Sequence, residues 1–126
     1  MTAYRTPLKN VRGLGAAKGG TEHFIVQRVT AAANIILIAF LVYAALSLAG
    51  ASRAEVKAFF SQPFAAIFGV LLGVSASVHM RIGMQVIVED YVHGGWKVLL
   101  LLLNTFFSIF AGAAIVLAVI KLYLGV

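Results

Sequence analysis

Residues 64–88 read FAAIFGVLLGVSASVHMRIGMQVIV, an apolar run whose only ionisable side chains are His79 and Arg81. A helix needs about 20 residues to cross the ~30 Å hydrocarbon core of a bilayer, so this run is long enough to span a membrane. Two further apolar runs of similar length occupy about residues 29–49 and 98–120. Because lipid cannot satisfy backbone polar groups and three segments cannot close a barrel, we predict an all-α integral membrane fold with three transmembrane helices.

The composition agrees with this fold and excludes several classes of protein. Of the 126 residues, 62% are hydrophobic and only 11% are charged, which is far too apolar for a soluble domain of this length. The absence of cysteine excludes disulfides, iron–sulfur ligation and thiol chemistry within the chain. We expect no cleavable signal peptide, since the first twenty or so residues are polar and glycine-rich. The connections between the runs leave no room for a soluble catalytic domain or a nucleic-acid-binding domain.

The net charge of +6 is distributed in a way that predicts topology. Lysine and arginine favour the cytoplasmic side of a membrane protein. With the N-terminus inside, six basic residues are cytoplasmic and three are outside, so we expect a cytoplasmic N-terminus and a C-terminus on the opposite side. The inside set is Arg5, Lys9, Arg12, Lys18, Arg28 and Lys97, and the outside set is Arg53, Lys57 and Lys121.

The polar segments divide the chain into an arm and a membrane region. Residues 1–20 form a predicted cytoplasmic arm, which is either a solvated tail or a segment lying over anionic headgroups or beneath a soluble partner. Residues 21–126 form the three-helix region, and Thr21 is the expected N-cap of its first helix.

Between the first and second spans, the sequence predicts a short surface helix ending at Phe60. Ser52 followed three residues later by Glu55 fits a capping box that opens this helix. Ser61 is expected to start the second span, with Pro63 in its first turn, where proline is tolerated.

Small and polar residues within the spans predict helix–helix contacts. Gly69 and Gly73 form a small-xxx-small pattern that lets two helices approach closely. In the third span, three polar side chains are expected to form interhelical hydrogen bonds rather than a site. These are Asn104, Thr105 and Ser108.

His79 is the most informative residue, because an ionisable side chain inside a span is costly and usually has a partner and a task. Imidazole can ligate haem iron, relay protons or serve as a structural hydrogen-bonding group, and spacing alone leaves these readings open. Gly83 lies one turn later on the same face, which leaves room beside the ring. A zinc site is not expected, because glycine at this i+4 position has no side chain that could ligate the metal. Arg81 is about 200° around the helix from His79, too far round to serve the same ligand at close range.

If His79 binds a haem that has two axial imidazoles, the second imidazole has to come from another chain. His93 lies about 21 Å further along the same helical path, at 1.5 Å per residue. His23 is expected at the inner membrane surface. Neither side chain is placed to reach the opposite face of such a haem.

Tyr91 and Asp90 end the second span about 18 Å along the helix from His79. A tyrosine at this depth is expected in the aromatic belt of a membrane interface. A phenol donor beside a carboxylate would also suit a quinone carbonyl that arrives from the lipid. Both interpretations are consistent with the sequence.

Taken together, these residues resemble a known family. The pattern of His79, Gly83-Met84 and Asp90-Tyr91 resembles the signature of the smaller, D-type membrane anchor of succinate dehydrogenase, respiratory complex II. The start of the first span, HFIVQRVTA over residues 23–31, is also similar to that family. The resemblance covers about residues 20–126.

The resemblance implies specific roles for residues of this chain. His79 would be one axial ligand of a b-type haem, and Arg28 would pair with a haem propionate, with His23 as the second candidate for that pairing. Tyr91 would hydrogen-bond ubiquinone, and Asp90 would support that site or its proton path.

The resemblance also implies partners and a location. A larger C-type anchor subunit would supply the second haem histidine and complete the helical bundle. FAD and the iron–sulfur clusters would lie in the partner flavoprotein and iron–sulfur subunits. The chain would be a multi-pass protein of a bacterial inner membrane with a periplasmic C-terminus, not catalytic by itself.

Three alternatives remain beside this interpretation. A fumarate reductase anchor using menaquinone would have a similar sequence. A small transporter would use Arg81, Glu89 and Asp90 to line a path. A purely structural helper of a larger complex would need no site.

Overall fold

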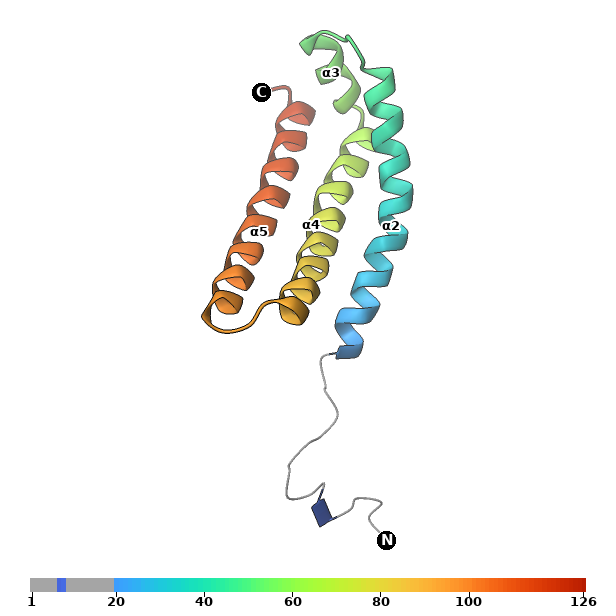
Figure 1. Ribbon diagram of the computed structural model, residues 1–126. Coiled ribbons are helices and arrows are strands. Elements are labelled where there is room, and N and C mark those ends of the chain that lie inside the picture. The colour runs from blue at the N-terminus through green and yellow to red at the C-terminus, as the bar shows by residue number, and fades with distance from the viewer. Residues whose placement is uncertain (1–6, 9–19) are drawn as a thin grey trace.

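Four α-helices follow one another along residues 20–126. The computed structural model describes residues 7–8 and 20–126, so most of the predicted arm lies outside the described residues. The helices are α2 (Gly20–Ser47), α3 (Arg53–Phe60), α4 (Pro63–Tyr91) and α5 (Gly95–Leu124) (Figure 1). Three of them, α2, α4 and α5, are long and apolar enough to cross a membrane, which confirms the predicted all-α fold with three membrane-spanning helices.

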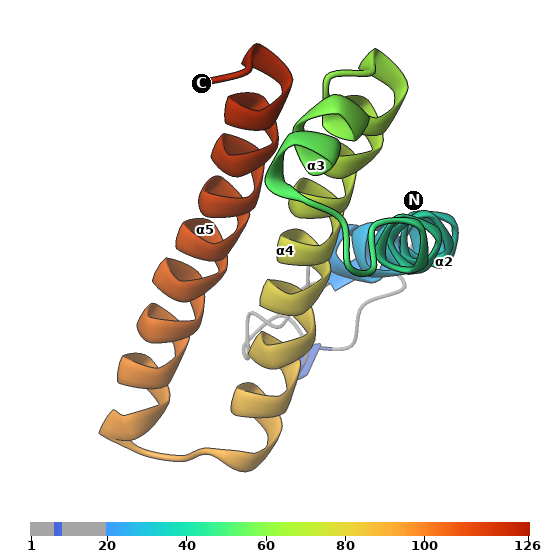
Figure 2. The same cartoon turned by 90° about the horizontal axis from the view of Figure 1, so that it is seen from above.

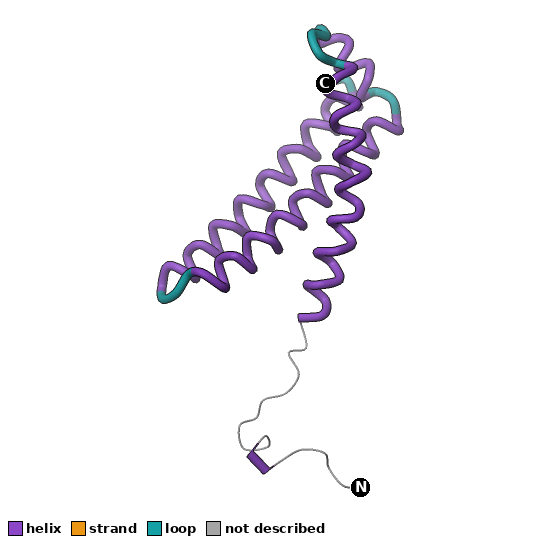
Figure 3. The backbone as a smooth tube through the Cα atoms, turned by 45° about the vertical axis from the view of Figure 1, so that its right-hand side comes forward, coloured by secondary structure: helices purple, strands orange, loops and turns teal. Residues whose placement is uncertain are grey.

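The three long helices are longer than the apolar runs that predicted them. They contain 28, 29 and 30 residues, or about 42–45 Å at 1.5 Å per residue, and so continue beyond the hydrocarbon core. Only the end of α2 falls short of its predicted run, because a turn over Leu48–Gly50 follows Ser47 and Gly50 has a positive φ of 77°. The connections lie at the two ends of the helices (Figure 3).

The short helix α3 has the predicted start, but the neighbouring helix starts are shifted. The Ser52 backbone N–H donates to Glu55 Oε2 at 2.7 Å and the Glu55 N–H donates to Ser52 Oγ at 3.4 Å, which is a capping box. The bonds from Ser52 also lower the pKa of Glu55.

The expectation that Ser61 starts α4 is wrong. The Ser61 N–H and hydroxyl both donate to Lys57 O and end α3, and Gln62 is the N-cap of α4. Thr21 is already inside α2.

Helix α4 is the centre of the membrane region. It packs against α5 on one side and α2 on the other, whereas α2 and α5 make no contact in the described part of the chain. Figure 2 shows this arrangement, in which α2 crosses beside α4 and α5 runs along the other side. The three helices therefore form an open layer, and the faces of α4 between its two neighbours stay accessible.

Small residues bring α4 and α5 close together, as predicted. Gly69 and Gly73 are buried, and a Cβ added at Gly73 would lie 2.9 Å from Ile115 Cγ2. Asn104 Nδ2 donates to the Arg81 carbonyl at 2.9 Å, an interhelical bond, and Ser108 Oγ bonds Asn104 Oδ1 at 3.4 Å within α5. The predicted interhelical role is therefore confirmed for Asn104 and wrong for Ser108, whose hydrogen bond stays within α5.

Replacing Gly73 with alanine is expected to destabilise the α4–α5 pair. The new methyl group would overlap Ile115, and overpacking of this kind typically costs about 1–3 kcal/mol. Thermal unfolding of the detergent-solubilised protein would show a lower midpoint. Gly95→Ala is the matched control, since nothing lies within 4 Å of a Cβ there. Equal midpoints for the two variants would contradict close packing at Gly73.

An aromatic cluster fixes the other helix pair at the α3 end. Phe40 of α2 lies with its ring centroid 5.1 Å from that of Phe68 and 6.3 Å from that of Phe59 in α3. Phe64 and Phe68 of α4 are 4.4 Å apart. Such pairs add to the burial of apolar area, so this end of α2 is held against α3 and α4 by ring contacts. The opposite end of the α2–α4 pair is where the polar residues gather.

Candidate functional site

A cavity of about 670 Å³ lies between α2 and α4, toward the ends at Gly20 and Tyr91. It brings together His79, Arg28 and His23, three of the five residues predicted for a site. Apolar side chains form much of its wall, and Glu89 is its acidic residue. The lining residues are Gly20, His23, Phe24, Gln27, Arg28, Ala31, His79, Ile82, Val86 and Glu89.

Thr30 of α2 contacts the imidazole of His79 directly. Its Oγ1 lies 3.2 Å from His79 Nδ1, across an interface that joins positions 49 residues apart. The same hydroxyl lies 2.8 Å from Val26 O and 3.1 Å from Gln27 O, one turn earlier in α2. Ser75, one turn before His79, donates to the Thr30 carbonyl at 3.4 Å. The level of His79 in α4 is thus fixed beside Thr30 in α2.

The basic residues of the cavity lie on one side of this level. Helix α2 rises 1.5 Å per residue, so Arg28 is about 3 Å and His23 about 10 Å from Thr30 toward the start of α2. The Arg28 guanidinium lies 4.6 Å above the ring centroid of Phe24, a cation–π contact that orients it. Glu89, at the far end of α4, accepts a hydrogen bond from Gln85 at 2.8 Å. An anionic group held near His79 would therefore meet the Arg28 guanidinium on its Gly20 side, where the Glu89 carboxylate also lines the cavity.

One buried polar atom in the cavity wall has no hydrogen-bond partner in the described chain. Gln27 lines the cavity, and its Oε1 is buried without a hydrogen bond. Leaving a buried acceptor unsatisfied typically costs about 1–3 kcal/mol. An orphan of this kind in a cavity wall is a feature of a site completed by a ligand, a water or another chain.

Tyr91 and Asp90 lie away from the cavity. Tyr91 is the last residue of α4, is 80% exposed and points about 120° around the helix from His79. Asp90 is also exposed. The structure therefore does not bring these two residues together with His79. They form a separate polar end of α4, next to the 92–94 connection.

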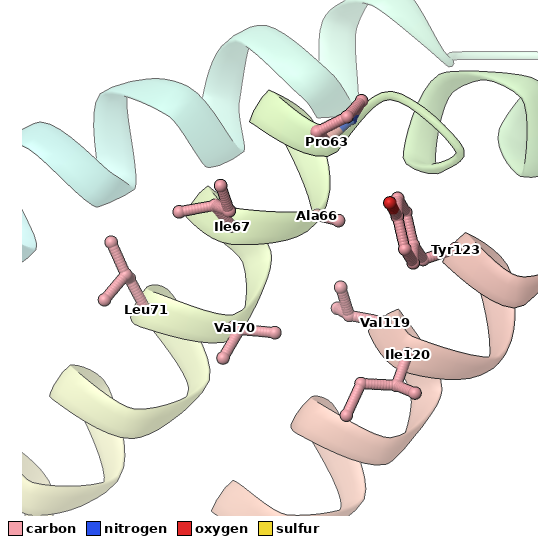
Figure 4. Close-up of a pocket in the computed structure, with 8 residues that line it drawn as sticks. All are labelled: Pro63, Ala66, Ile67, Val70, Leu71, Val119, Ile120 and Tyr123. Carbon is pink, nitrogen blue, oxygen red and sulfur yellow. The ribbon is translucent and has the colours of Figure 1, made fainter.

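A second cavity, of about 360 Å³, lies between α4 and α5 at the end near α3. Figure 4 shows its wall, to which Tyr123 of α5 contributes the phenol ring beside Ala66 and Pro63 of α4. The other lining side chains carry only hydrocarbon, as Ile67, Val70, Leu71, Val119 and Ile120 do. This cavity offers one phenol and no imidazole, whereas the α2–α4 cavity contains His79 and Arg28 and is the candidate site.

Arg81 belongs to neither of these two cavities. It lines a third one with Ser77 and Ser108, on the α5 side of α4. The prediction that Arg81 cannot serve the same ligand as His79 agrees with this separation. The three residues of the transporter alternative are also dispersed, since Glu89 lines the α2–α4 cavity and Asp90 lies at the exposed end of α4.

Sequence reasoning missed Thr30 and Gln27. The signal was present, because Gln27, Thr30 and Asn34 recur at spacings of three and four and so share one face of α2. A polar stripe on an otherwise apolar span marks the side that faces other polar groups. Asn34 is buried and, like Gln27, has an unpaired side-chain oxygen.

Residues 2–120 match the sequence profile of a family described as the succinate dehydrogenase/fumarate reductase transmembrane subunit. The chain belongs to this family. The membership confirms the resemblance predicted from His79, Gly83-Met84 and Asp90-Tyr91. It also makes the three long helices those of a multi-pass membrane subunit.

Individual relatives agree with the family. The chain is 30% identical over 122 residues to a succinate dehydrogenase hydrophobic membrane anchor subunit from Paracoccus denitrificans, covering 97% of this chain and 95% of the relative. It is 26% identical over 89 residues to the protein of the same description from Rickettsia bellii (strain RML369-C), covering 71% of each. No solved structure gives a significant match.

Proposed function

We propose that this chain is the hydrophobic membrane-anchor subunit of a succinate:ubiquinone oxidoreductase. In this role it supplies one axial ligand of a b-type haem, contributes to the quinone site and holds the flavoprotein and iron–sulfur subunits at the membrane. The observation that carries the proposal is the position of His79 in a cavity between two spans, with Arg28 in the same wall. The descriptions of the relatives support the choice of succinate dehydrogenase.

The residues of the α2–α4 cavity fit haem. His79 offers an imidazole nitrogen for the iron, and Arg28 offers a guanidinium that matches a propionate in charge and shape. Phe24, Ala31 and Ile82 provide apolar wall for a macrocycle. The unpaired Gln27 oxygen is consistent with a site that something else completes. When bound, a b-type haem would supply one-electron storage within the membrane.

The second axial histidine is proposed to come from the C-type anchor subunit. His23 lies about 10 Å from the level of His79 along α2, and His93 lies beyond the end of α4. These are the other two histidines of the chain. His23 is instead the second candidate for a propionate. The open layer of three helices leaves faces of α4 uncovered on which a partner anchor can complete the bundle.

Tyr91 and Asp90 are proposed to serve the quinone at the end of α4. The exposed Tyr91 phenol can donate a hydrogen bond to a quinone carbonyl, and the neighbouring carboxylate can receive and pass on a proton. Quinone reduction takes up two electrons and two protons, so a proton-conducting group is needed where quinone binds. The electrons are proposed to come from succinate through FAD and iron–sulfur clusters in the partner subunits.

The proposed location is a bacterial inner membrane with residues 1–20 in the cytoplasm. The six-to-three distribution of basic residues supports this orientation. It puts Tyr91 and the 92–94 connection on the cytoplasmic side, and the end of α5 in the periplasm. The membrane-anchor part is residues 21–126; residues 1–6 and 9–19 of the arm lie outside the described residues.

The test is a reduced-minus-oxidised absorbance spectrum of the purified native complex, together with its quinone kinetics. We expect a b-type haem band and faster succinate oxidation with ubiquinone than fumarate reduction with menaquinol. A complex without a haem band would overturn the ligand role of His79. A preference for fumarate reduction would favour the fumarate reductase anchor, which the family description also covers.

A further inference from the structure

We propose that Thr30 is the positioning residue for His79: its hydroxyl accepts the imidazole Nδ1–H and thereby presents Nε2 to iron. The inference rests on the proposed haem function and deepens it. It assigns a task to a residue of α2 that touches neither iron nor quinone.

A threonine hydroxyl has one hydrogen to donate and two lone pairs to accept with. In Thr30 the oxygen lies 2.8 Å from Val26 O and 3.1 Å from Gln27 O, and carbonyl oxygens can only accept. Three acceptors therefore compete for one hydrogen, and the two carbonyls make the shorter contacts. Directing the hydrogen back along α2 leaves a lone pair of Thr30 Oγ1 to accept from His79 Nδ1 at 3.2 Å, and this is the assignment that we propose.

With this assignment, His79 Nδ1 carries a hydrogen. In a neutral imidazole only one nitrogen is protonated, so Nε2 keeps its lone pair. This is the form that binds a metal, and the bond made by the other nitrogen selects it. The chain thus holds His79 in the ligating tautomer through its own contacts.

The α2–α4 interface also fixes the ring in place. Ser75, one turn before His79, donates to the Thr30 carbonyl at 3.4 Å. Thr30 is consequently bonded to α4 through its backbone as well as its side chain, at adjacent turns. A β-branched side chain has few rotamers in a helix, which keeps the hydroxyl on this line. The imidazole is therefore oriented by two helices.

A hydrogen bond donated by Nδ1 has an electronic consequence for a metal bound at Nε2. It makes the imidazole more basic, and a more basic ligand stabilises the more positively charged state of the metal. Removing the acceptor should therefore favour the reduced state. Thr30 is expected to hold the reduction potential of the site below the value it would otherwise have.

The experiment compares Thr30→Val, Thr30→Ser and Thr105→Val in the purified native complex. Thr30→Val keeps the shape and removes the acceptor; Thr30→Ser keeps the hydroxyl; Thr105→Val makes the same chemical change on α5. Optical redox titration of the haem band is the first readout. We expect a positive shift for Thr30→Val of about tenfold in the oxidised-to-reduced equilibrium, ~59 mV for one electron. The other two variants should titrate like the unaltered complex.

The second readout does not depend on haem. Nitrogen chemical shifts of ¹⁵N-labelled histidine in the haem-depleted complex distinguish the two tautomers of His79. We expect Nδ1–H in the unaltered protein and a gain of Nε2–H in Thr30→Val. A complex that never binds haem would overturn the proposed function, yet the tautomer would still test Thr30. An unchanged potential or an unchanged tautomer in Thr30→Val, or an equal shift in Thr105→Val, would overturn the positioning role.

Discussion

Replacing His79 with alanine is expected to abolish the b-type haem band of the complex while succinate oxidation by a soluble dye continues. The reason is geometric: no other imidazole of this chain lies at the level of Thr30, where His79 is held. Methyl in place of imidazole removes the proposed iron ligand outright. Loss of a supporting group beside a ligand already lowers metal affinity about 10–100-fold, and loss of the ligand itself should exceed that.

His93→Ala is the matched control for this variant. His93 follows the end of α4, is exposed and lies outside the α2–α4 cavity, so its removal should leave the haem band intact. His23→Ala should have an intermediate result, a retained band with weaker haem binding, since His23 shares the cavity with Arg28. A His79→Ala complex with an unaltered spectrum would show that the imidazole is structural or a proton relay.

Part of the candidate site could be predicted because two of its residues are recognisable from their immediate sequence neighbours. His79 stood out as an ionisable side chain in an apolar run, and Arg28 as a cation at the edge of another. Placing them in one cavity required knowing that α2 packs on α4. That His79 and Arg28 would serve the same haem was implied only by the family resemblance. The family membership now supports the resemblance, whereas the roles of individual residues stay proposals.

Thr30 could not be predicted as a partner of His79 for a physical reason. A threonine in a span commonly satisfies its hydroxyl on the carbonyl one turn earlier, and Thr30 does so with Val26. Its second contact joins positions 49 residues apart and depends on the α2–α4 register. That register is set by long-range packing, including the Phe40–Phe68 contact at the far end. The local sequence pattern around Thr30 does not predict this register.

The helix boundaries could likewise be predicted only where one local interaction decides them. The capping box at Ser52 and Glu55 was predictable because both residues lie within one turn. The start of α4 was misplaced at Ser61, since two hydrogen bonds to Lys57 keep that serine in the preceding helix. Competing local bonds of similar strength decide such ends.

Replacing Tyr91 with phenylalanine is expected to slow ubiquinone reduction about tenfold while dye reduction by the flavoprotein end is unchanged. The substitution removes one hydroxyl, and a hydrogen bond worth about 1.4 kcal/mol corresponds to a factor of ten. The ring remains, and Tyr91 is 80% exposed in this chain, so the variant should fold and assemble normally. A defect confined to quinone turnover would then report the lost donor.

Tyr123→Phe is the control that separates a quinone donor from an interfacial tyrosine. Tyr123 also ends a span, but it lies near the last turn of α5 and faces an apolar cavity at the opposite end of the layer. Its hydroxyl should have no effect on ubiquinone reduction. If Tyr91→Phe and Tyr123→Phe both turn over quinone at the normal rate, Tyr91 belongs to the aromatic belt alone. If only Tyr91→Phe is slowed, the end of α4 beside Asp90 is where quinone accepts its hydrogen bond, some 18 Å along the helix from the imidazole of His79.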